Sequence, residues 1–200
     1  MTRWIYCNRI DGKQEGDFVA GEIPLNPPFS KWETEKGNMI KKSKESRRIT
    51  IIGAGNLLLK DEGIGIHTVK ALQEMRLPPN VRLIDGGTSP DLIAFSGDCD
   101  KLIIIDAAKA GGEPGTIYRF RPEDLAGNVN VLASAHELGV PENIAMMSLL
   151  GKKPAETLII GIEPKEIDGG LELSALLEGK IPEIVRVVMK ETGLKPLDSR

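Results

Sequence analysis

The residues of this chain best suited to chemistry lie in the segment IIGAGNLLLKDEGIG, at positions 51–65. Two glycines, Gly53 and Gly55, follow a β-branched run and permit a tight turn after a strand. Where a dinucleotide-binding loop would carry its third glycine the chain has a leucine, and a carboxylate pair, Asp61 and Glu62, follows. Since a phosphate-binding loop needs backbone N–H groups and no negative charge, the segment suits a cation or a reacting peptide better. We expect both carboxylates at the mouth of a strand–helix crevice.

Three further polar residues stand where predicted strands end or in a loop. Asp85 and Asp106 end the second and third predicted strands, and His136 lies in the connection before a later helix. In an open α/β sheet, ligands bind outside the carboxyl ends of the strands. Glu62, Asp106 and His136 would form a carboxylate–carboxylate–imidazole set with open coordination positions. Such a set suits a borderline divalent ion such as zinc or nickel, and the sequence alone does not choose between them.

Each of these three residues also has an ordinary structural explanation. Asp106 could cap the turn after its strand, and the helix dipole alone could favour Glu62 at a helix start. A single loop histidine is more often structural or exposed than a ligand. The other histidine, His67, lies five residues after Glu62 and on a different helical face, so we expect no role for it in the site.

The glycines of this segment have two possible uses, in binding a dinucleotide and in close backbone packing. Gly53 and Gly55 are half of a dinucleotide-binding fingerprint, and Asp85 falls where a ribose-binding acid is expected. The missing third glycine and the carboxylates count against a bound dinucleotide. Gly63 and Gly65 weaken the start of the predicted helix, and we expect them to allow close backbone approach, either by a neighbouring element or by a substrate chain.

The elements that must position these residues alternate along the chain. The pattern predicts strands at 48–52, 81–84, 101–105, 116–120 and 157–162, and helices at 62–75, 90–95, 141–150 and 174–192. The third strand is apolar throughout, as in a central parallel strand, and the fourth alternates, as in an edge or hairpin strand. Pro182 predicts a kink or break in the last helix. The alternation indicates an α/β protein, a three-layer α/β/α domain with a mainly parallel sheet.

The N-terminal part of the chain differs in composition from the rest. Residues 1–38 hold five of the eight aromatic residues, and prolines interrupt any long element. We interpret 1–47 as a poorly ordered extension or an upstream stretch included by a misplaced start, and 48–200 as one domain. A partner-binding arm or a nucleic-acid tail are the alternatives for 1–47, because KKSKESRR at 41–48 is basic. So short a basic run is usually a solvated tail.

Composition excludes several classes of protein. The 200 residues suffice for one domain with a core, and the net charge of −3 gives no general attraction to nucleic acid. Cys7 and Cys99 match no metal or redox spacing, which is typical of thiols in a reducing compartment. No apolar run approaches the roughly 20 residues of a membrane helix, and no signal peptide is recognised. We therefore expect a cytoplasmic protein that engages no membrane.

The motifs together resemble those of the hydrogenase maturation endopeptidases, which trim the large subunit of nickel–iron hydrogenases. The motifs that carry the resemblance are GAGNLLLKDEGIG (53–65), IDGGTSPDL (84–92), LIIIDAA (102–108), SAHELG (134–139) and GIEP (161–164). They stand in the family's order and span residue 48 to the end of the chain. Residues 1–47 have no recognised counterpart in the family.

The resemblance implies a fold, a reaction and a site. The fold is α/β/α with a five-stranded, mostly parallel sheet, and the reaction removes a short C-terminal extension from the large-subunit precursor once nickel has been inserted. The family's metal-contacting Glu, Asp and His correspond to Glu62, Asp106 and His136, which would sense nickel and place the scissile bond. The nickel would then be supplied by the substrate, and no nucleotide is implied.

The resemblance also implies a secondary set of residues and a partner. Asp85, Gly86, Gly87 and Asn56 would lie beside the crevice and contact the substrate. The partner would be the hydrogenase large-subunit precursor, engaged by a monomer. One departure from the family pattern is Pro141, which stands soon after His136 and places the histidine on a loop.

The mechanism and two other function classes stay open at this point. A divalent ion could polarise the scissile carbonyl or generate hydroxide, or two carboxylates could share the proton work as in aspartic proteases. No Ser-His-Asp or HExxH pattern supports a serine protease or a zincin. The alternatives to a peptidase are a non-catalytic metal-sensing or chaperone-like module on the same fold and a nucleotide-binding α/β protein.

Overall fold

A single five-stranded sheet forms the centre of the molecule. The computed structural model describes residues 47–88, 91–122 and 140–194, so His136 and the predicted extension up to residue 46 lie outside the described residues. The strands are β1 (Ile49–Ala54), β2 (Val81–Gly87), β3 (Lys101–Ala107), β4 (Ile117–Phe120) and β5 (Glu156–Ile162). Their order is β2-β1-β3-β5-β4, and β4 alone of these runs antiparallel to its neighbour. The predicted mainly parallel sheet, with 116–120 as an edge strand, is confirmed.

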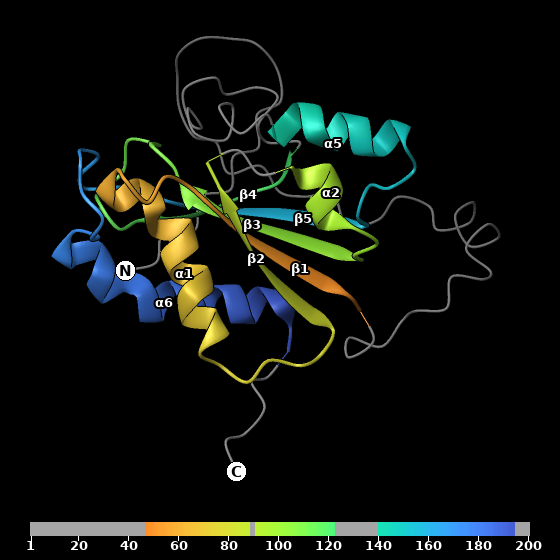
Figure 1. Ribbon diagram of the computed structural model, residues 1–200, viewed down its shortest axis with the longest axis horizontal. Helices are drawn as coiled ribbons and strands as arrows, with labels where there is room; N and C mark the ends of the chain where they lie inside the picture. Colours follow the sequence, from red (N-terminus) through yellow and green to blue (C-terminus); the bar gives the residue numbers. More distant parts are fainter. Residues whose placement is uncertain (1–46, 89–90, 123–139, 195–200) are drawn as a thin grey trace, which may run out of the picture.

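Helices cover both faces of the sheet and complete three layers (Figure 1). On one face lie α1 (Ile64–Gln73) and α6 (Ala175–Thr192), which contact each other. On the other face lie α2 (Leu92–Ser96) and α5 (Val140–Leu149), also in contact. Among the described residues, no helix combines the length and apolarity needed to cross a membrane.

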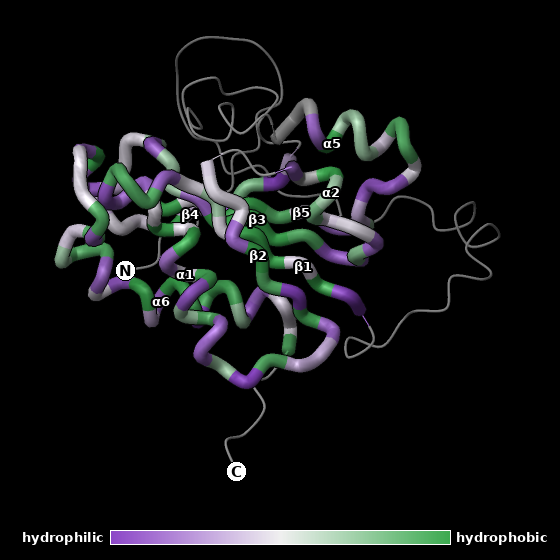
Figure 2. The backbone as a smooth tube through the Cα atoms, in the orientation of Figure 1, coloured by the Kyte–Doolittle hydropathy of each residue, from purple (hydrophilic) through white to green (hydrophobic). Residues whose placement is uncertain are grey.

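The two central strands are buried on both faces because both helical layers pack on them. All six residues of β1 and all seven of β3 are buried. Ile51 and Ile103 face the layer of α1 and α6, while Ile52 and Ile104 face the layer of α2 and α5. Figure 2 shows the same division, with a hydrophobic centre and more hydrophilic connecting loops. Strands buried on both faces need continuous apolar sequence, which both supply.

The strands extend further than the local sequence pattern predicts. Asp85 and Asp106 lie inside β2 and β3, not at their ends. β2 continues because Gly87 pairs with Ala54 across a register shift, and β3 continues because Asp106 pairs with Gly161 of β5. These pairings involve residues distant in sequence, so a local pattern does not contain them.

Two helices also differ from their predictions. The predicted helix 62–75 begins with a separate 3₁₀ turn, η2 (Lys60–Gly63), before α1. The predicted kink or break at Pro182 is not a break, since α6 is one continuous helix across it. Leu177 and Ile184, on either side of the proline, are both fully buried in the core. Their packing offsets the backbone hydrogen bond that a helical proline cannot donate.

The strand order creates one point where connections diverge. From β1 the chain crosses to β2 on one side, and from β2 it returns to β3 on the other side of β1. Ligand sites in open α/β sheets form at such switch points, outside the carboxyl ends of the two strands. In this molecule those are the carboxyl ends of β1 and β3.

Glycines bring the start of α1 into backbone contact with both of these strands. A Cβ at Gly65 would collide with the carbonyl oxygens of Ala54 and Ile105, and one at Gly53 would collide with the carbonyl of Gly65. A Cβ at Gly63 would lie 3.1 Å from a methyl carbon of Leu57. Of the two predicted uses of Gly63 and Gly65, close approach by a neighbouring element is therefore the one observed.

We predict opposite effects for two glycine-to-alanine substitutions in helices. Gly65→Ala should lower the free energy of unfolding by about 1–3 kcal/mol, because the added methyl overpacks against backbone. Gly179→Ala in α6 should raise it by up to about 1 kcal/mol, because nothing beyond the adjoining residues and backbone of its own helix lies within 4 Å of the new methyl and alanine favours helix. Urea unfolding measures both. Equal stability of the two variants would contradict the backbone contact at Gly65.

Candidate functional site

The turn that carries Glu62 lies across the switch point. η2 follows β1 through a loop shaped by Asn56, whose side-chain oxygen accepts the N–H of Leu58 at 2.9 Å. The carbonyl oxygen of Glu62 lies against Gly55, where φ is +134° and any Cβ would collide with that oxygen. η2 also contacts β3. Glu62 is therefore placed at the carboxyl ends of β1 and β3, as predicted from its position after the first strand.

Asp106 lies at the same edge, inside the central strand. The residue is 3% exposed, and its Oδ1 accepts the N–H of Ala107 at 2.8 Å. Its neighbour Ile105 pairs with Gly53 of β1, so Asp106 stands one residue beyond the last pair between these strands. The structure thus brings the Glu62 turn and Asp106 to the same edge of the sheet.

Asp85 and its glycine pair form the adjacent end of β2. The Oδ1 of Asp85 accepts the N–H of Gly87 at 3.1 Å, and the carbonyl of Gly87 accepts the N–H of Gly55 at 3.0 Å. Gly87 has a φ of +62°, which favours glycine. Asp85 itself is exposed. These contacts give Asp85 and Gly87 a structural role at the rim, and the predicted contact of Asp85, Gly86 and Gly87 with substrate stays a prediction.

The third predicted ligand, His136, lies outside the described residues. Within the described ranges, no group of three or more His, Cys, Asp or Glu side chains is arranged to hold a metal ion. The set of Glu62, Asp106 and His136 therefore stays a prediction, of which the first two members share one edge.

Asp61 does not lie at the crevice mouth, contrary to our expectation for both carboxylates of the pair. It is fully buried and accepts four hydrogen bonds from the segment that joins β5 to α6. Oδ2 accepts the N–H groups of Lys165 and Glu166 at 2.9 and 2.8 Å. Ser174 donates its N–H to Oδ1 at 2.7 Å and its hydroxyl to Oδ2 at 2.9 Å. The sequence holds one signal that Asp61 and Glu62 would not share a site. Adjacent residues of a helical turn point in different directions.

Further contacts join the same two segments. The N–H of Lys60 donates to the carbonyl of Gly170 at 2.9 Å, and the N–H of Gly170 donates to the carbonyl of Leu58 at 3.0 Å. The Lys60 ammonium pairs with Glu166 at 3.1 Å and with Asp168 at 2.7 Å. Hydrogen bonds to Asp168 and Glu166 raise the pKa of Lys60.

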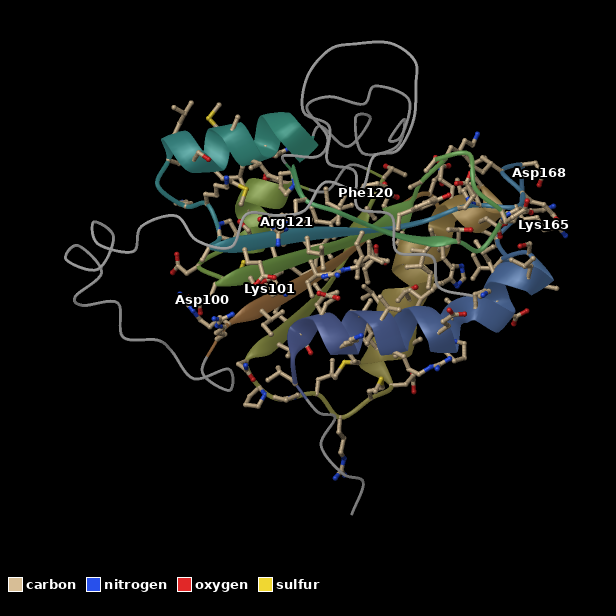
Figure 3. All side chains as sticks on the ribbon, turned by 180° about the vertical axis from the view of Figure 1, so that it is seen from behind. Asp100, Lys101, Phe120, Arg121, Lys165 and Asp168 are labelled. Atoms are coloured by element: carbon tan, nitrogen blue, oxygen red, sulfur yellow. The ribbon has the colours of Figure 1, made fainter. Side chains whose placement is uncertain are left out.

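Figure 3 shows where this contact lies in the molecule. Lys165 and Asp168 stand at one end of the sheet, and Asp100 and Lys101 stand at the opposite, amino-terminal end of β3. The segment that binds Asp61 is therefore at the carboxyl edge of the parallel strands, the edge that carries Glu62 and Asp106.

A second buried carboxylate, Glu163, holds the loop that follows β3. Its Oε2 accepts the N–H groups of Ala110 and Gly112 at 2.8 and 3.2 Å and the hydroxyl of Tyr118 at 2.6 Å. In the sequence, Glu163 is marked only by its place in the GIEP motif. Burial is the main cause that raises the pKa of Tyr118 to about 12, and the hydrogen bond to Glu163 is the second.

The arrangement supplies two carboxylates at one edge of the sheet, Glu62 from the turn η2 and Asp106 from β3. Asp106 is buried and Glu62 is half-buried, so each is shielded in part from water. Such groups can accept and return protons or provide oxygen ligands to a hard or borderline cation. Glu62 and Asp106 are therefore chemically suited to proton transfer or to metal binding, and their roles in the site stay predictions.

We predict that the ionisation of Tyr118 reports on its buried hydrogen bond to Glu163. In the wild-type protein the absorbance of Tyr118 should rise with a pKa of about 12, and Tyr118→Phe should remove that step. Because the folded-state pKa is raised above the ordinary value of about 10, the stability that Tyr118 contributes is complete below pH 10 and is lost as pH rises toward 12. Ultraviolet titration of both proteins measures this, and a Tyr118 step near pH 10 would contradict the buried contact.

Comparison with known proteins agrees with the fold and shows the family. Residues 66–191 match the family described as "Hydrogenase maturation protease", a range that begins after Glu62 and includes Asp106. The hydrogenase 2 maturation protease of Escherichia coli is 31% identical over 156 residues, covering 75% of this chain and 95% of its own length. The HupD hydrogenase expression/formation protein of Rhodobacter capsulatus is 34% identical, covering 72% of this chain and 70% of its own.

Solved structures give the same result. The hydrogenase maturating endopeptidase HybD from E. coli superposes with a TM-score of 0.65 at 29% identity, over 75% of this chain and 96% of its own. The [NiFe] hydrogenase maturation protease HybD from Thermococcus kodakarensis gives 0.59 at 26% identity, over 72% and 99% of the two chains. The chain therefore belongs to the hydrogenase maturation protease family, a family of peptidases.

Proposed function

We propose that this protein removes the C-terminal extension from the large-subunit precursor of a nickel–iron hydrogenase after nickel has been inserted. The observation that carries the proposal is the position of the Glu62 turn and Asp106 at the carboxyl ends of β1 and β3. The family match adds that this fold belongs to peptidases that act in hydrogenase maturation. The substrate is thus a protein, and its nickel arrives with it.

In this proposal Glu62, Asp106 and His136 contact the nickel-bearing part of the precursor. Two carboxylates and an imidazole suit a borderline divalent ion such as nickel. A carboxylate at this edge could also accept the proton of the attacking water and return a proton to the leaving nitrogen. Binding of the nickel-bearing part would position one peptide bond of the precursor at these groups. That positioning would account for cleavage at a single bond.

The backbone at the first strand end supports a peptide substrate over a nucleotide. The carbonyl oxygen of Glu62 stands against Gly55, at the point where a pyrophosphate would approach the glycine turn. An oxygen lone pair there repels a phosphate. Asp85 and Asn56 line the same rim and are proposed as substrate contacts. We propose a cytoplasmic monomer, in keeping with two cysteines that match no pairing or metal spacing.

We predict that Glu62→Gln and Asp106→Asn each slow the trimming of a nickel-loaded precursor by at least about 100-fold, the range of a lost proton-transfer or ligand group. Mass spectrometry of the precursor measures the loss of its C-terminal segment. Glu74→Gln serves as the matched control, because Glu74 is exposed at the end of α1.

The control should trim at the wild-type rate, and circular dichroism should show all three variants folded. Wild-type rates for Glu62→Gln and Asp106→Asn would contradict the proposed site. A wild-type protein that binds the precursor without shortening it would contradict the proposed reaction and leave a non-catalytic binding module.

A further inference from the structure

We infer that Asp61 is a positioning residue, whose buried carboxylate locks the Glu62 turn to the segment between β5 and α6. The inference rests on the proposed function, because Glu62 is itself assigned to the site only there. Asp61 touches no substrate, since its side chain is fully buried. Its effect on the reaction would pass through the geometry of its neighbour.

The hydrogen bonds of Asp61 leave the turn little freedom. Both carboxylate oxygens are engaged, by three backbone N–H groups and one hydroxyl. Its own N–H donates to the carbonyl of Glu166 at 3.2 Å, so backbone and side chain bind the same segment. A buried carboxylate that loses such partners is strongly destabilised, so the turn moves only together with residues 165–174.

The residues on both sides of Glu62 are fixed as well. Before it, Lys60 has a left-handed φ of +46°, which a non-glycine residue adopts only where neighbours hold it. After it, Gly65 packs against the carbonyls of Ala54 and Ile105. The carbonyl of Glu62 itself rests on Gly55. The strained backbone of Lys60 and these close contacts with β1, β3 and the loop after β1 thus define where the Glu62 side chain begins.

A simpler role for Asp61 would be to stabilise α6. Ser174, which binds Asp61, is also the N-cap of that helix, and its hydroxyl accepts the N–H of Leu177 at 3.4 Å. If Asp61 only stabilised α6, its loss would lower the stability of the fold but not the turnover of the folded enzyme. The positioning role predicts instead that turnover falls in the folded protein.

The test compares Asp61→Asn and Ser174→Ala with Val188→Ala. Val188 is fully buried in α6 and outside the proposed site, so its truncation lowers stability without touching the turn. Asn keeps the size of Asp but places an amide donor against backbone donors, and Ser174→Ala removes one of the four hydrogen bonds. Well below the unfolding temperature, kcat should fall about 10- to 100-fold in Asp61→Asn and less in Ser174→Ala. KM should stay near that of the wild type, and Val188→Ala should keep the wild-type kcat.

Hydrogen exchange separates this inference from the proposed function. The amide of Glu62, which donates to the carbonyl of Leu59 at 3.1 Å, should exchange at least tenfold faster in Asp61→Asn than in Val188→Ala. Unchanged kcat and unchanged exchange in Asp61→Asn would overturn the positioning role even if the wild-type protein trims the precursor. If exchange is faster in Asp61→Asn but the wild-type protein does not trim the precursor, Asp61 does hold the turn in place. That result would still overturn its role in the reaction, together with the proposed function.

Discussion

The buried carboxylate of Asp61 is the interaction on which the rest of this site depends. Hydrogen bonds to a charged group contribute about 1.5–3 kcal/mol each, and Asp61 accepts four of them from one segment. They join a turn near the start of the domain to a loop more than 100 residues later. These hydrogen bonds hold the segment before α6 against the carboxyl edge of the sheet. They also fix Ser174, the N-cap at which α6 begins.

The glycines provide the second constraint. α1 can approach β1 and β3 to backbone contact only because Gly53 and Gly65 carry no side chain there. With the helix start fixed, the turn before it must lie across the two strand ends. The strand order β2-β1-β3-β5-β4 makes that position the switch point, where Asp106 already stands. Local turn geometry and sheet topology therefore place both carboxylates at one edge.

Much of this arrangement could be predicted from the sequence, because its causes are local. Continuous apolar runs predicted the central strands, alternation predicted the edge strand, and the strand ends predicted that Glu62 and Asp106 share one edge of the sheet. The buried roles of Asp61 and Glu163 could not be predicted, since their donors lie 45 to 113 residues away and no local pattern marks them. The extra length of β2 and β3 has the same origin, because pairing with distant strands extends them.

In the proposed reaction Glu62 and Asp106 contact the same part of the precursor, and a double-mutant cycle measures whether the two carboxylates act as a unit. Trimming rates of a nickel-loaded precursor would be measured for wild type, Glu62→Gln, Asp106→Asn and the double variant. Residues that act as a unit are strongly non-additive, so the double variant should trim no more than a few-fold slower than the slower single variant. A double variant whose loss in rate equals the product of the two single losses would show that the two carboxylates act independently and would contradict a shared site.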